Sequence, residues 1–155
     1  MIFTRVLMLT VVFVGGAGCA TTSPKDAPKV RAAATTDANA LPAQELANGA
    51  CGIFFWSMTS PKHFVFFQKE GANTAEFFFD ARAQKLRAEQ VTSGLEDSYG
   101  VNLSYTGPST EKITVKGVYS EVLDGGRRIS DAAIIIGKDD GWQEIMPVSG
   151  LYACR

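Results

Sequence analysis

The chain of 155 residues contains one histidine, His63, and histidine is the side chain best suited to proton transfer near neutral pH. A Ser-His-Asp hydrolase would have to use it. The chain has no nucleophile elbow GxSxG, no zinc-binding HExxH, no P-loop and no GxGxxG. A lone histidine that follows a proline and a lysine is more often structural or exposed than catalytic. The sequence therefore predicts no catalytic residue.

Two pairs of neighbouring carboxylates, Glu96-Asp97 and Asp139-Asp140, are the remaining candidates for acid-base chemistry. Cleavage of a glycosidic bond requires two carboxylates that converge on one bond. Neighbours on a strand point to opposite faces, and both pairs lie near glycines, which is typical of turns. Asp139-Asp140-Gly141 also lacks the ligand spacing of a calcium-binding EF-hand loop. We therefore expect neither a metal nor a cofactor.

The three cysteines are Cys19, Cys51 and Cys154, and no CxxC motif is present. If Cys19 is modified or removed at the N-terminus, an even pair remains in an exported chain. Such a pair is most simply a disulfide. Cys51 begins the first predicted strand and Cys154 ends the last, so their bridge would hold together the two ends of a closed sheet.

Three aromatic runs, at residues 54–56, 64–67 and 77–79, are apolar on both faces of a strand. A one-layer barrel buries only one of these faces, whereas a two-layer core buries both. In a barrel the second face needs a cover, for which the candidates are the linker, residues 80–90 as a helix, a partner or a ligand. Phe55, Trp56 and Val65 are the candidate residues for binding a ligand or partner.

The elements that carry these residues alternate with a period close to two, which is typical of strands. Asp124-Gly125-Gly126-Arg127 is typical of a tight hairpin, and Gly117 predicts a bulge inside a long strand. Residues 80–90 favour a helix by propensity, but their context favours a strand from Lys85 to Val91. We predict an all-β fold of seven or eight antiparallel strands, which forms a meander closed into a barrel or a two-layer sandwich.

The N-terminus has the pattern of a secretory signal peptide, with Arg5 before a short apolar stretch and then small residues. The run Gly16-Ala17-Gly18-Cys19 resembles the lipobox of bacterial lipoproteins, which implies lipidation of Cys19. Cleavage after Ala20, without a lipid, is the alternative. The absence of Asp at position 20 implies the outer membrane in a Gram-negative host.

The predicted organisation is a signal peptide over residues 1–18, a lipid-anchored flexible linker over 19–49 and one β domain over 50–155. Within the linker, residues 41–48 have the composition of a short helix that Gly49 would end. The linker holds no aromatic residue and is rich in Ala, Thr and Pro, so it is expected to stay flexible. No later segment is long and apolar enough to span a membrane as a helix.

The charge balance is close to neutral, with 15 basic and 16 acidic residues, and gives no reason to expect nucleic acid as a partner. The best hypothesis is a non-catalytic lipoprotein of the cell envelope whose periplasmic β domain binds another macromolecule. Small lipid-anchored β domains with a disulfide resemble periplasmic lysozyme and protease inhibitors, in the layout of the chain only. A lipocalin-like carrier of a small apolar ligand is the alternative, and an enzyme comes third.

Overall fold

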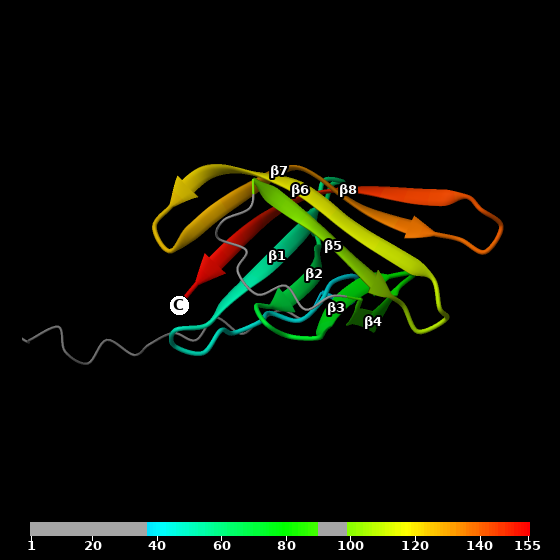
Figure 1. Ribbon diagram of the computed structural model, residues 1–155, viewed down its shortest axis with the longest axis horizontal. Coiled ribbons are helices and arrows are strands. Elements are labelled where there is room, and N and C mark those ends of the chain that lie inside the picture. The colour runs from blue at the N-terminus through cyan, green and yellow to red at the C-terminus, as the bar shows by residue number, and fades with distance from the viewer. Residues whose placement is uncertain (1–36, 90–98) are drawn as a thin grey trace, which may run out of the picture. The chain divides into compact units, whose positions relative to one another are not determined.

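The computed structural model describes residues 37–89 and 99–155, and these residues form eight β-strands and no helix (Figure 1). The strands are β1 (Cys51–Ser57), β2 (Phe64–Lys69), β3 (Thr74–Phe79), β4 (Arg82–Ala88), β5 (Gly100–Thr106), β6 (Lys112–Leu123), β7 (Gly126–Gly137) and β8 (Gln143–Cys154). Each strand pairs antiparallel with the next, and β8 pairs with β1, so the sheet closes into a barrel. The all-β prediction is confirmed, and the barrel is the arrangement observed.

A disulfide closes the seam between the first and last strands. Cys51 and Cys154 stand opposite each other in the β1–β8 ladder, with their Cα atoms 4.0 Å apart, and their sulfurs are bonded. The predicted pairing is therefore confirmed. The bridge joins residues 103 positions apart. In the chain-entropy model, a loop of that size restricts the unfolded chain by about 4 to 5 kcal/mol.

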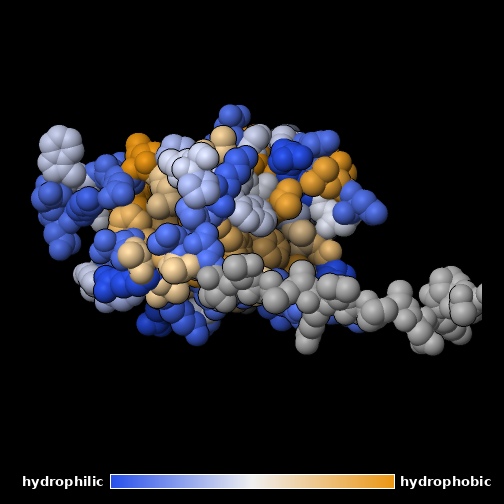
Figure 2. Space-filling view, turned by 180° about the vertical axis from the view of Figure 1, so that it is seen from behind, coloured by the Kyte–Doolittle hydropathy of each residue, from blue (hydrophilic) through white to orange (hydrophobic). Residues whose placement is uncertain are grey.

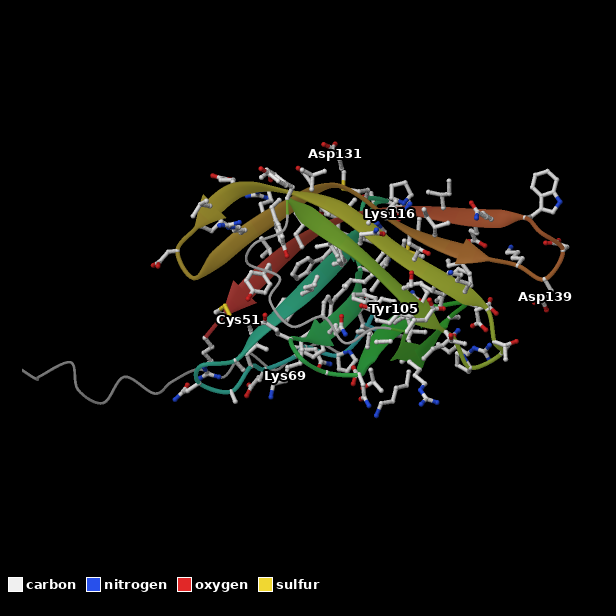
Figure 3. All side chains as sticks on the ribbon, viewed as in Figure 1. Cys51, Lys69, Tyr105, Lys116, Asp131 and Asp139 are labelled. Atoms are coloured by element: carbon white, nitrogen blue, oxygen red, sulfur yellow. A yellow bond between two sulfur atoms is a disulfide. The ribbon has the colours of Figure 1, made fainter. Side chains whose placement is uncertain are left out.

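Side chains from most of the strands pack together in the interior of the barrel. The largest wholly buried apolar side chains come from six of the eight strands, and they are Ile53, Phe55, Phe66, Phe77, Leu86, Ile113, Val115, Ile129 and Ile134. Tyr105 is wholly buried among them and donates a hydrogen bond to Gln68 Oε1 at 2.5 Å (Figure 3). Gln68 Nε2 in turn donates to the carbonyl of Ala72. The buried polar groups of Tyr105 and Gln68 therefore have the hydrogen-bond partners that buried polar groups require.

Three long strands, β6 to β8, are joined by two hairpins that project at opposite ends of the molecule (Figure 1). In the first hairpin Leu123 pairs with Gly126, and Gly125 has a φ of 79° in the two-residue turn, as predicted. The register also shifts between Lys116 and Val118, which confirms the bulge at Gly117. On the face shown in Figure 2, polar areas in blue lie beside apolar areas in tan and orange.

Residues 80–90 begin with a tight turn and continue as a strand. β4 starts at Arg82, three residues before the predicted start at Lys85, and the predicted end at Val91 lies outside the described residues. Asp80 and Ala81 both have positive φ, and Phe79 pairs with Arg82 across them. This two-residue hairpin turn was not predicted because it lacks the glycine that usually marks one.

The predicted helix over residues 41–48 is wrong, because this segment has no regular secondary structure. Its backbone groups bond to the barrel instead of to one another. The N–H of Leu41 donates to the carbonyl of Phe64 at 2.7 Å, and the carbonyl of Leu46 accepts from the Arg155 guanidinium at 3.1 Å. Tertiary contacts therefore replace the local hydrogen bonds that a helix would have made.

Candidate functional site

Four aromatic rings lie on the outer face of β1 and β2. Because successive side chains of a strand point to opposite faces, Phe54 and Trp56 point outward while Phe55 fills the core. On β2, Phe67 pairs with Phe54, and Phe64 pairs with Trp56. Centroids of neighbouring rings lie 5.0 to 6.4 Å apart, and all four residues are partly buried. The four rings form one apolar surface, the aromatic patch.

Part of the aromatic patch is covered by residues 37–46, which we call the covering segment. Leu41 is only 5% exposed, and the Gln44 side chain donates a hydrogen bond to Glu76 on β3 at 3.1 Å. Leu46 packs near Gly52, where an added Cβ would lie 3.2 Å from the leucine Cδ2 atom. The C-terminal part of the predicted linker therefore covers some of the outward-facing aromatic side chains.

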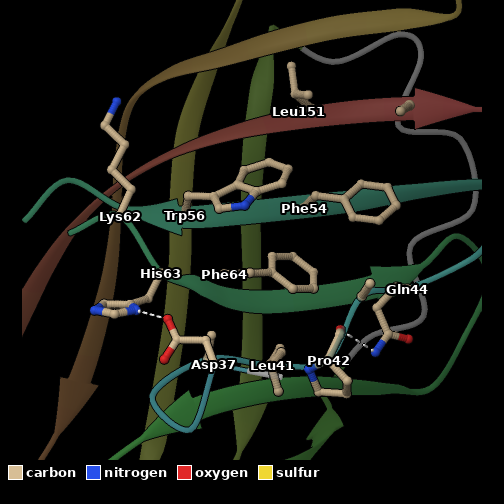
Figure 4. A pocket seen from close by; sticks show the side chains of 13 residues that line it. Asp37, Leu41, Pro42, Gln44, Phe54, Trp56, Lys62, His63, Phe64 and Leu151 are labelled. Atoms are coloured by element: carbon tan, nitrogen blue, oxygen red, sulfur yellow. Dashed lines mark hydrogen bonds and ion pairs between the residues drawn. The ribbon is translucent and has the colours of Figure 1, made fainter. Parts of the chain in front are cut away.

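Between the covering segment and β8 the patch remains open as a groove of about 610 Å³ (Figure 4). Its floor is made of the Phe54, Trp56 and Phe64 rings, which Figure 4 shows broadside between Leu151 on β8 and the covering segment. Polar side chains stand at its border. A concave, mostly apolar surface with a few polar groups is the usual form of a ligand site. We call this feature the aromatic groove.

A hydrogen-bonded pair, His63 and Asp37, forms part of the polar border of the aromatic groove. His63 Nδ1 and Asp37 Oδ2 lie 2.7 Å apart, and the Asn39 N–H donates to Asp37 Oδ1 at 2.9 Å. These hydrogen bonds, first that from Asn39 and then that from His63, lower the pKa of the Asp37 carboxyl. Asp37 is therefore ionised at neutral pH, and Lys62 also lines the groove.

An Asp-His pair also orients the histidine of hydrolytic triads, so the position of a nucleophile decides what this pair can do. In a triad the second ring nitrogen, Nε2, faces a hydroxyl. The nearby Ser57 is 5% exposed, and its Oγ accepts the backbone N–H of His63 at 3.0 Å. Within residues 37–89 and 99–155, no hydroxyl is hydrogen-bonded to His63 Nε2. The Asp37 carboxylate therefore orients the His63 imidazole at the groove.

The paired carboxylates do not assemble a second site in the described residues. Asp139 and Asp140 occupy the turn between β7 and β8, where Asp140 Oδ1 accepts the N–H of Trp142 at 3.0 Å. Glu96 and Asp97 lie outside the described residues. In the part of the chain that the structure describes, no group of three His, Cys, Asp or Glu residues is placed to hold a metal ion.

The residues predicted to bind a ligand or partner are divided between two environments. Trp56 lies in the groove floor, whereas Phe55 is 0% exposed and Val65 is 4% exposed. Phe55 and Trp56 are neighbours on β1 and so cannot share a face. The alternation that predicts the strand also places Phe54 beside Trp56, and this signal identifies the residue that was missed. Leu41 could not be identified this way because it lies outside the strands.

The predicted lipidation site, Cys19, and the signal peptide lie outside the described residues. Among residues 37–89 and 99–155, none belongs to a helix that could cross a membrane. Comparison with protein-family models, curated proteins and solved structures finds no match to this chain.

Proposed function

We propose that the protein is a non-catalytic lipoprotein of the cell envelope, anchored to the outer membrane through Cys19, whose barrel binds another macromolecule in the aromatic groove. The observation that carries the proposal is the position of its aromatic residues. Phe54, Trp56 and Phe64 line an outward groove of about 610 Å³, although burying such rings is the usual way to stabilise a small barrel. A groove that leaves them accessible favours a role in binding.

The lipocalin-like alternative, a carrier with a small apolar ligand inside the barrel, is less well supported. Phe55, Phe66 and Phe77 are 0% exposed and pack against one another in the interior. With Tyr105 and Leu86, which are also 0% exposed, they occupy the space that an internal ligand would need. The groove lies on the outside of the barrel, where a large partner can reach it.

Retention of envelope fractions on the immobilised protein tests the proposal. Purified sacculi, solubilised outer-membrane proteins and soluble periplasmic proteins are passed separately over the wild-type protein. We expect the wild-type protein to retain one fraction. The immobilised double variant, which combines Trp56→Ala and Phe64→Ala, should not retain it. The matched control is Trp142→Ala, because Trp142 is 75% exposed and does not line the groove.

Circular dichroism and the urea midpoint establish that each variant is folded before its retention is compared. Equal retention by the wild-type protein and the folded groove variant would contradict the assignment to the groove. Retention of no fraction by the wild-type protein would contradict a binding role altogether.

A further inference from the structure

The rings in the floor of the aromatic groove are arranged differently from the rings around Phe66 in the core. The planes of Phe54 and Trp56 differ by 18°, those of Phe54 and Phe64 by 28°, and those of Trp56 and Phe64 by 37°. In the core, the plane of the Phe66 ring makes an angle of 63° with that of Phe55 and 64° with that of Tyr105. This is the edge-to-face packing that aromatic rings favour. The groove rings instead present their faces together to the opening (Figure 4).

The face of an aromatic ring carries excess negative charge, so it attracts bonds whose hydrogens are partly positive. The C–H bonds on the two faces of a β-linked pyranose with equatorial hydroxyls are groups of this kind. The hydroxyls of such a sugar project from its edge and need hydrogen-bond partners there. At the border of the groove, Asp37 and Gln44 offer acceptors, and Lys62 offers a donor.

His63 connects the groove to a second depression, of about 740 Å³, because it lines both. The second depression is more polar, and its lining includes Thr59, Asp80, Lys138 and Glu144. A ligand longer than the groove can therefore continue over His63 and meet further hydrogen-bonding groups. This arrangement suits a polymer better than a single small molecule.

We infer that the aromatic groove binds a β-linked oligosaccharide chain, whose sugar rings stack on Phe54, Trp56 and Phe64. This inference rests on the proposed function and names the class of macromolecule. An added peptide strand is less favoured, because β1 already pairs with β2 and β8 and so offers no free edge. Glycan strands of the cell wall have the required chemistry and would be within reach of a protein anchored in the envelope.

Tryptophan fluorescence tests the inference, because the chain has two tryptophans and only Trp56 lies in the groove. In a Trp142→Phe background, Trp56 is the single reporter. Titration with chitotetraose or cellotetraose should give a saturable change in its emission. Trp56→Leu keeps an apolar side chain but removes the ring. Calorimetry should show weaker oligosaccharide binding by this variant, by about tenfold, the scale of one lost stacking contact.

The possible results distinguish a failure of the oligosaccharide inference from a failure of the proposed binding function. If the groove retains envelope proteins but neither tetrasaccharide changes the Trp56 emission at millimolar concentration, the oligosaccharide inference fails and the proposed function stands. Equal affinity of Trp56→Leu and the parent for chitotetraose would also overturn the inference, since stacking would then contribute nothing. If no envelope fraction and no tetrasaccharide binds, both proposals fail.

Discussion

Phe55 packs its ring against the bare backbone of Gly150, its partner in the β1–β8 ladder. A Cβ added at Gly150 would overlap the ring and would lie 2.7 Å from the carbonyl oxygen of Phe54. The glycine therefore makes the space that a large aromatic side chain occupies inside the barrel. The same ladder carries Trp56 and Phe54 on its outer side, so the packing of Phe55 also supports the floor of the groove.

The first prediction is that Gly150→Ala destabilises the barrel by about 1 to 3 kcal/mol, because overpacking a filled core forces side chains and backbone to shift. Urea unfolding followed by circular dichroism measures the change. The neighbouring variant Ser149→Ala serves as the control, since Ser149 lies on the other face of β8 and is only partly buried. Equal stability of Gly150→Ala and the wild-type protein would show that Phe55 can move without cost.

The disulfide should contribute strongly to stability, because it closes a loop spanning 103 residues. Replacing Cys51 and Cys154 together by serine is expected to lower the free energy of unfolding by about 4 to 5 kcal/mol. The wild-type protein in excess dithiothreitol should lose a similar amount. Guanidinium titrations with and without the reductant measure both effects. A wild-type midpoint that does not respond to reduction would contradict the loop-closure argument.

Tyr105 should make stability fall at alkaline pH. Burial raises the pKa of its hydroxyl well above the ordinary value of 10.0, so the folded protein keeps this proton. The unfolded chain releases it above about pH 10, and it then binds fewer protons than the folded state. The free energy of unfolding should therefore fall above pH 10, by up to about 1.4 kcal/mol per pH unit from this group.

Unfolding titrations at pH 8, 10 and 11 measure this slope, which Tyr105→Phe should reduce. At pH 8 the variant should lose about 1 to 3 kcal/mol, because Gln68 Oε1 is left without its hydrogen-bond donor. Tyr99→Phe is the control, since Tyr99 is 97% exposed. Burial also raises the pKa of Tyr119, to about 12, so part of the slope should remain in Tyr105→Phe. An unchanged slope in that variant would rule out the assignment to Tyr105.

Lipidation at Cys19 is tested by labelling cells with radioactive palmitate. The wild-type protein should carry the label and partition into the detergent phase of Triton X-114, because the acyl chains dominate its affinity for apolar phases. Cys19→Ser should lose both properties. Mass spectrometry of the wild-type protein discriminates the alternative, since a mature N-terminus at Thr21 without a lipid would mean cleavage after Ala20.

Much of the fold follows from local features of the sequence. Alternation along β5, the glycines at the β6–β7 hairpin and the bulge at Gly117 each depend on residues that are close in the chain, and all were predictable. The disulfide was predictable as well, because only two cysteines remain in the predicted domain. The Asp80-Ala81 turn was not predictable, since its positive φ angles are imposed by the pairing of β3 with β4.

The sequence alone determined that the chain makes an antiparallel β fold joined at its ends by a cysteine pair, because strand period and turn chemistry are local. Only the tertiary structure decided that the strands close into a barrel and that residues 37–46 cover part of its outer face. It also decided which aromatic residues reach the surface. Leu41 meets Phe64, and Asp37 meets His63, through contacts between residues more than twenty positions apart, which no local pattern specifies.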